Sequence, residues 1–179
     1  MKKILLILSM MILLAGCQFN SSPKNEVENL LKKYQNLDEE VLGDLELTSE
    51  SSMFREEQKD DYINVMKTQY QDLKYEIQSE EIDADKASVT VNISVYDYYK
   101  AQKEAGEYMN EHREEFMNGE EFDNDKYLTY KIVKMQNTSS RVDYTIVIDL
   151  TKNGDKWVVD KMDSTTLKKI HGTYNYENN

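Results

Sequence analysis

The chain is poor in the residues that cross-link or interrupt a fold, with one cysteine, one proline and six glycines among 179 residues. With a single cysteine, disulfides play no part within the chain. Because proline and glycine are the main breakers of regular structure, their scarcity predicts that most of the chain forms helices and strands. Only two histidines are present, and no Ser-His-Asp, Cys-His or glycine-rich phosphate-binding motif can be assembled.

An excess of basic residues is also absent. Lysine and arginine total 22 against 34 aspartates and glutamates, which gives a formal net charge of −12. Such acidity excludes nucleic acid as a partner and opposes docking of the protein surface on anionic lipid. Thirteen tyrosines, four phenylalanines and one tryptophan supply a core, so the chain is folded and its length suits one domain.

The N-terminus has the three parts of an export signal. Lysines occupy positions 2–3, an apolar run extends over residues 4–14, and Ala15-Gly16-Cys17 follows. The run is shorter than the roughly 20 apolar residues that cross a bilayer. Leu14-Ala15-Gly16-Cys17 resembles the lipobox of bacterial lipoprotein precursors. The alternative is an ordinary secretory signal in which Cys17 is incidental.

The resemblance implies cleavage before Cys17 and attachment of a diacylglyceryl group to its thiol. This group carries palmitate-type acyl chains. We therefore expect residues 1–16 to be a signal peptide and residues 17–24 a lipidated tether. Two or more acyl chains give stable anchoring, at about 0.8 kcal/mol for each buried methylene. The expected location is the extracytoplasmic face of the cell membrane, with the lipid anchor as the only membrane contact.

Hydrophobic periodicity divides the remaining chain into helices and strands. Apolar residues recur at helical spacing from Val27 to Leu42, with a break near Asp38, and again from about Met53 to Leu73. Strict alternation predicts four strands, and Asn153-Gly154 is the strongest hairpin signal between two of them. These strands cover residues 74–78, 87–95, 142–150 and 156–162.

Between the two strand pairs the period is helical over residues 99–116, and Asn118-Gly119 closes that helix. A second helix is expected after a cap at Asp123 to Asp125, but Leu128, Tyr130 and Ile132 also alternate as in a strand. A short last helix begins at Asp163 or Ser164 and stops at Gly172. Residues 173–179 are expected to be a loose tail.

This order predicts an α+β domain over residues 25–172. N-terminal helices pack on a curved four-stranded antiparallel sheet, with a helical insertion between the two hairpins. At Gly154-Asp155-Lys156-Trp157-Val158-Val159 the chain resembles the closing strand of exported proteins with a nuclear transport factor 2-like, or cystatin-like, fold. The resemblance implies a curved sheet wrapped around a long helix, and the insertion departs from it.

Tyr96-Asp97-Tyr98-Tyr99 is the most suggestive chemical cluster. An aspartate flanked by tyrosines could be a general base beside a phenol donor, as in ketosteroid isomerase. The plainer interpretation is a strand end that packs its rings under the next helix.

The remaining candidates favour structural roles. His112 and Glu115 share a helix face but lack further zinc ligands, so a solvated charged surface is expected. His171 is interpreted as a cap in the last turn of a helix, where positive charge is favourable. Asp123-Asn124-Asp125 begins like a calcium loop but has Leu128 and Lys134 where glycine and glutamate belong.

No metal or cofactor is therefore predicted. The sequence favours a lipid-anchored, non-enzymatic module that binds a ligand or a partner in the envelope. The alternative is an isomerase or dehydratase that uses Asp97 as its general base.

Overall fold

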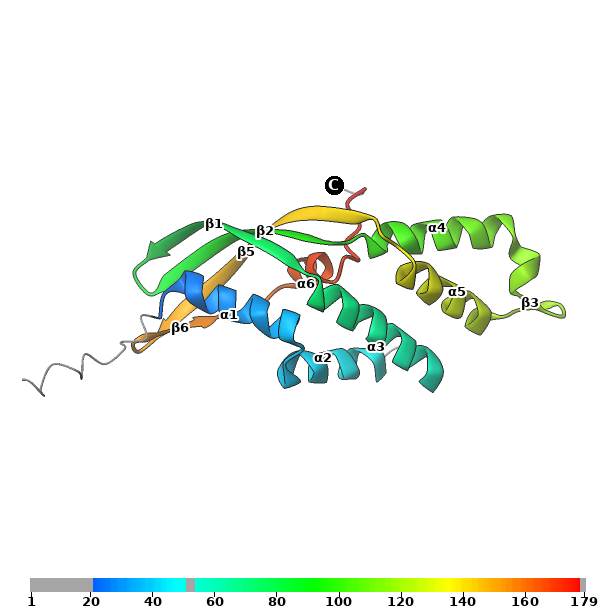
Figure 1. Ribbon diagram of the computed structural model, residues 1–179, viewed down its shortest axis with the longest axis horizontal. Coiled ribbons are helices and arrows are strands. Elements are labelled where there is room, and N and C mark those ends of the chain that lie inside the picture. The colour runs from blue at the N-terminus through cyan, green and yellow to red at the C-terminus, as the bar shows by residue number, and fades with distance from the viewer. Residues whose placement is uncertain (1–20, 51–53, 178–179) are drawn as a thin grey trace, which may run out of the picture.

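The computed structural model describes residues 21–50 and 54–177 and confirms the α+β class. One antiparallel sheet has the strand order β1-β2-β5-β6, so the two hairpins are joined through β2 and β5 (Figure 1). Its strands are β1 (Lys74–Asp83), β2 (Lys86–Tyr96), β5 (Arg141–Asn153) and β6 (Lys156–Val159). The helices are α1 (Pro23–Asn36), α2 (Glu39–Glu50), α3 (Glu56–Gln71), α4 (Tyr98–Glu111), α5 (Asn124–Gln136) and α6 (Ser164–Ile170).

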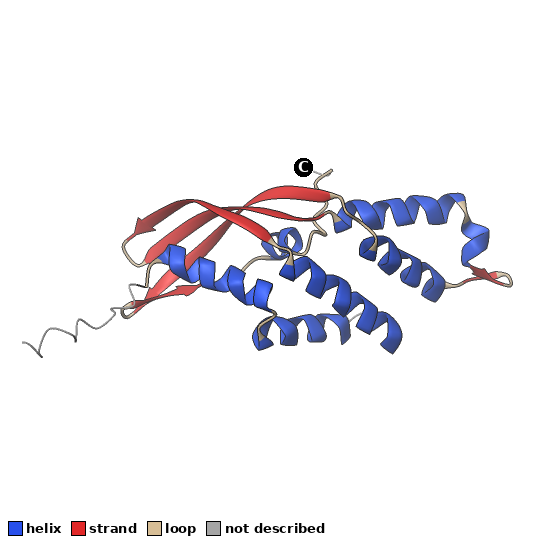
Figure 2. Cartoon of the chain, viewed as in Figure 1, coloured by secondary structure: helices blue, strands red, loops and turns tan. Residues whose placement is uncertain are grey.

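The core lies on one face of the twisted sheet. Alternate residues of β2, from Val89 to Val95, point to this face and are fully buried, and Ile146 and Ile148, which pair with them on β5, do the same. Helices α1 and α6 contact β2 on this side, and α3 packs against both α1 and α2 (Figure 2). The opposite face carries Ser88, Thr90, Asn92 and Ser94 and remains accessible. One dry face and one wet face explain the alternation of the sequence.

The expected insertion is a helical arm that extends past the end of the sheet (Figure 1). Helices α4 and α5 pack together and are joined by a 3₁₀ turn (Arg113–Phe116) and a small ribbon of β3 (Met117–Asn118) and β4 (Glu121–Phe122). The Asp123 side chain accepts a hydrogen bond from the Lys126 N–H and caps α5. Residues 124–136 are therefore helical, and the strand alternative for this segment is wrong.

Several boundaries differ from the sequence prediction: β1 continues to Asp83 instead of residue 78, β5 spans Arg141–Asn153 instead of residues 142–150, and β6 ends at Val159 instead of residue 162. The last hairpin turns at Gly154-Asp155, because Asn153 still pairs with Lys156 and Gly154 supplies the positive φ of 62° at the first turn position. Helix α1 starts earlier than expected, with Pro23 in its first turn and Ser22 accepting the Asn25 N–H. Residues 23–24, the last two of the expected tether, therefore belong to α1.

The expected loose tail is ordered as far as residue 177. Tyr174 and Tyr176 pack against the core, and Glu177 accepts a hydrogen bond from Lys103 on α4 at 2.6 Å. Two large aromatic rings bury enough apolar area to order such a short segment. The sequence pattern missed this because the tail has no helical or strand period.

Trp157 lies on β6 with 8 % of its surface exposed, on the same face as Val159, whereas Val158 between them is 49 % exposed. This confirms the predicted strand face. Trp157→Ala should lower the free energy of unfolding by about 3–5 kcal/mol, as large aromatic deletions from cores do. Denaturant titration measures the change, and Val158→Ala is the matched surface control, with an expected effect within about 0.5 kcal/mol. Equal midpoints for the Trp157 variant and the wild type would contradict this burial energy.

Candidate functional site

The predicted lipid-attachment residue, Cys17, lies outside the described residues, as does the signal peptide. No helix within residues 21–50 and 54–177 is long and apolar enough to cross a membrane.

Asp97 lies at the junction of β2 and α4 and is 5 % exposed. One carboxylate oxygen accepts the Lys100 N–H at 3.0 Å and caps α4, and the other accepts the Tyr176 hydroxyl at 2.9 Å. Five depressions on the described surface are all lined without Asp97. Both carboxylate oxygens hold the strand end, the helix and the C-terminal segment together.

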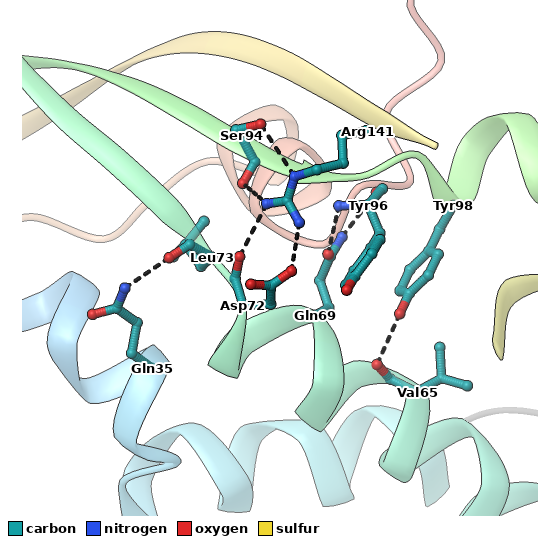
Figure 3. A network of polar contacts seen from close by, with 9 residues as sticks. All are labelled: Gln35, Val65, Gln69, Asp72, Leu73, Ser94, Tyr96, Tyr98 and Arg141. Carbon is teal, nitrogen blue, oxygen red and sulfur yellow. Dashed lines mark hydrogen bonds and ion pairs between the residues drawn. The ribbon is translucent and has the colours of Figure 1, made fainter. Parts of the chain in front are cut away.

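The tyrosines beside Asp97 are also structural. The Tyr98 hydroxyl donates to the Val65 carbonyl at 3.0 Å in the core, and the Tyr96 ring stacks on the Tyr98 ring at 6.1 Å between centroids. Gln69 on α3 pairs with both backbone groups of Tyr96, accepting from its N–H and donating to its carbonyl (Figure 3). Of the two interpretations for this cluster, the geometry fits the packed strand end.

A second polar cluster joins the same strand end to α3. Arg141 donates to the Asp72 carboxylate at 2.6 Å and to the carbonyls of Asp72 and Ser94 at 3.0 and 2.7 Å (Figure 3). Hydrogen bonding by Tyr96, together with the charge of Arg141, lowers the pKa of Asp72. Sequence analysis missed Arg141 because its partners come from segments that are distant along the chain. The cluster fixes the arrangement of α3, β2 and β5.

His112 and Glu115 lie 3.8 Å apart on an exposed surface, where the His112 ring stacks on Tyr108. Within the part of the chain that the structure describes, no three His, Cys, Asp or Glu side chains gather where a metal could bind.

A cavity of about 280 Å³ lies between α1, α2, α3 and α6. We call it the tyrosine cavity, because Tyr34, Tyr62 and Tyr70 line it together with His171. The Tyr34 and Tyr70 rings meet edge to face at 5.1 Å, and the Tyr70 ring lies 5.8 Å from the His171 ring. The remaining wall is mostly apolar and comes from α2 and α6, through Val41, Leu45, Leu47 and Leu167.

The polar atoms of this aromatic lining have no protein partner among the described residues. No hydrogen bond between described residues includes the imidazole of His171. The same holds for the hydroxyls of Tyr34, Tyr62 and Tyr70. Every fully buried polar side-chain atom in the described ranges does have a partner. The unpaired hydroxyls must therefore keep some accessible surface, and the cavity is where these largely buried residues have it.

The pKa values of Tyr34, Tyr70 and His171 keep their side chains uncharged at neutral pH. Burial raises the pKa of Tyr34 to about 12, and burial raises the pKa of Tyr70 further. Burial lowers the pKa of His171 to about 4, so its ring is neutral at neutral pH. His171 does occupy the C-cap of α6, but the expected positive charge there is wrong, because the desolvation cost of that charge exceeds the helix-end attraction.

Replacing tyrosine by phenylalanine at one core position and one cavity position tests whether the cavity hydroxyl is unpaired. Tyr98→Phe should lower the free energy of unfolding by about 1 kcal/mol, because it leaves the buried Val65 carbonyl without its donor. Tyr70→Phe should leave stability unchanged or slightly raised, since its hydroxyl has no protein partner to lose. Thermal unfolding of both variants measures this contrast, and equal losses would contradict it.

Comparison with known proteins gives no family. No family model and no curated protein matches the chain. A crystal structure of a "putative lipoprotein" (ycdA) from Bacillus subtilis is similar at 16 % identity, with a TM-score of 0.45. The likeness covers 86 % of this chain but only 48 % of that protein, so the chain spans about half the length of its neighbour. So distant a likeness carries no argument about fold or activity, and the resemblance to nuclear transport factor 2-like domains stays a prediction.

Proposed function

We propose that the chain is a lipid-anchored, extracytoplasmic and non-enzymatic module that binds a small ligand in the tyrosine cavity. The observation that carries the binding role is the set of hydroxyls of Tyr34, Tyr62 and Tyr70, which have no protein partner among the described residues and lie at a largely apolar cavity. Ligand sites commonly combine apolar walls with a few convergent polar groups. Phenol donors and a neutral imidazole suit a flat molecule that carries hydrogen-bond acceptors.

The anchoring part of the proposal rests on the Leu14-Ala15-Gly16-Cys17 motif. A lipid on Cys17 would place the start of α1 a few residues from the membrane surface. The acidic composition would then keep the domain away from an anionic surface.

A direct binding measurement tests the cavity. The full lipidated chain in phosphatidylcholine nanodiscs is dialysed against naphthalene-2-sulfonamide, an uncharged aromatic acceptor, with empty nanodiscs as the blank. We expect saturable binding that Tyr70→Phe weakens about fivefold, the value of one neutral hydrogen bond. Tyr75→Phe on β1, outside the cavity, is the control and should bind as the wild type does. Absence of saturable binding would overturn the proposal.

The enzyme alternative predicts a different result at Asp97. An Asp97→Asn variant cannot take up a proton, but its amide oxygen can still accept one of the two hydrogen bonds. Since Asp97 acts as a helix cap here, this variant should complement a deletion strain fully once it is folded and anchored. Complete loss of function in a folded, anchored Asp97→Asn protein would instead favour an isomerase-like enzyme.

A further inference from the structure

Lys131 on α5 lines a second cleft, of about 300 Å³, which we call the lysine cleft. Its walls come from segments that are distant along the chain, including Phe54, Gln102 on α4 and Met135 on α5. Among the described residues, no carboxylate lines this cleft. In a chain with 34 acidic residues, a cleft whose described lining combines one lysine with uncharged side chains is an exception to the surrounding charge.

Among the residues that the structure describes, the Lys131 ammonium group has no counter-ion. None of the ion pairs or hydrogen bonds among the described residues includes its Nζ, which lies 5.4 Å from the centre of the Tyr127 ring. Burial lowers the pKa of Lys131, so the charged form is held at some cost in free energy. A half-buried cation without a partner gains more from a bound anion than an exposed, already paired lysine does.

The lysine cleft and the tyrosine cavity share part of their walls. Tyr62 and Thr48 line both depressions, so the two lie next to each other. The charges at the two ends differ, because Asp44 lines the tyrosine cavity, whereas Lys131 is the charged group of the lysine cleft. An anion is therefore repelled at one end and attracted at the other, which fixes the orientation of a bound molecule.

We propose that the natural ligand is an organic monoanion with a flat apolar body, whose carboxylate- or sulfonate-like group binds Lys131 while the body lies against Tyr62 and enters the tyrosine cavity. This assignment rests on the proposed function and adds the chemical class of its ligand. The acidic surface makes the class specific, since an anion finds little attraction elsewhere on the molecule.

Two probes of matched shape test the charge. Naphthalene-2-sulfonate carries a negative charge, and naphthalene-2-sulfonamide does not. The full lipidated chain in phosphatidylcholine nanodiscs should bind the sulfonate at least about tenfold more tightly, as a charge-assisted contact provides. Lys131→Gln should abolish this preference and leave sulfonamide affinity unchanged. Lys134→Gln, which removes a lysine three residues further along α5 and over the Tyr130 ring, is the matched control and should keep the preference.

The outcomes separate the two proposals. If both probes bind equally and Lys131→Gln changes neither, while Tyr70→Phe weakens both, the anionic class is wrong and the cavity remains a binding site. If neither probe binds, both proposals are overturned. If Lys134→Gln removes the preference as strongly as Lys131→Gln, the effect is one of general charge and the assignment to Lys131 is wrong. Melting curves recorded for each variant establish that the binding results come from folded protein.

Discussion

Gly172→Ala is expected to lower the free energy of unfolding by about 5 kcal/mol, close to the whole stability of a marginal domain. Gly172 follows α6 at a φ of 69°, where an alanine is strained by about 1–2 kcal/mol. A Cβ at this position would overlap the Tyr96 carbonyl oxygen and the Gln69 side-chain amide. Relief of that overlap must separate Gln69 from Tyr96 and disturb the bond from the Tyr99 N–H to the Gly172 carbonyl. Strain, overpacking and lost hydrogen bonds therefore add.

The chain offers a control with the opposite expected sign. Gly43 lies inside α2 and no atom lies within 4 Å of an added Cβ. Gly43→Ala should raise stability by about 0.5–1 kcal/mol, because alanine loses less backbone entropy in a helix. Chemical denaturation of both variants measures the pair. A Gly172→Ala protein as stable as the wild type would show that the backbone can move away from the added methyl group without loss.

The fold was predictable wherever one face of an element is wet and the other dry. The alternation from Ala87 to Val95 predicts both β2 and its buried face, and the structure confirms both. Trp157 also lies on the strand face that its sequence predicts. Caps were predicted at Asp123 to Asp125 and at Asp163 or Ser164, and in the structure Asp123 and Asp163 each accept a hydrogen bond in the first turn of their helix. These signals are local, so a single sequence contains them.

Other features depend on contacts between distant segments, which no local pattern contains. The ordered tail is held by Tyr176 against Asp97, 79 residues away along the chain. Arg141 and Asp72 are 69 residues apart, and neither has an unusual neighbourhood in sequence. The ambiguous segment at Leu128 to Ile132 fitted two periods, and its packing on α4 and the cap at Asp123 decided between them.

The candidate site was missed for a related reason. Tyr34 and Tyr70 occur on helical stripes, where an aromatic residue is usually core, and both are indeed largely buried. They are candidate ligand-binding residues because each hydroxyl lies at a cavity and has no partner among the described residues. The cavity itself depends on how α1, α2, α3 and α6 pack together. A tyrosine instead of a phenylalanine at a core position is the faint signal that the sequence does contain.

Cys17→Ser is expected to remove the lipid anchor and release the protein from the membrane. Serine has no thiol to accept the diacylglyceryl group. Two acyl chains give effectively stable anchoring, whereas without them an acidic domain has little affinity for an anionic surface. Fractionation of cells should move the variant from the membrane to the aqueous fraction, and Gln18→Ser, which keeps the thiol, should stay anchored. Intact-mass measurement of wild-type protein from the membrane should show a lipid on Cys17, and an unmodified cysteine there would refute the lipoprotein assignment.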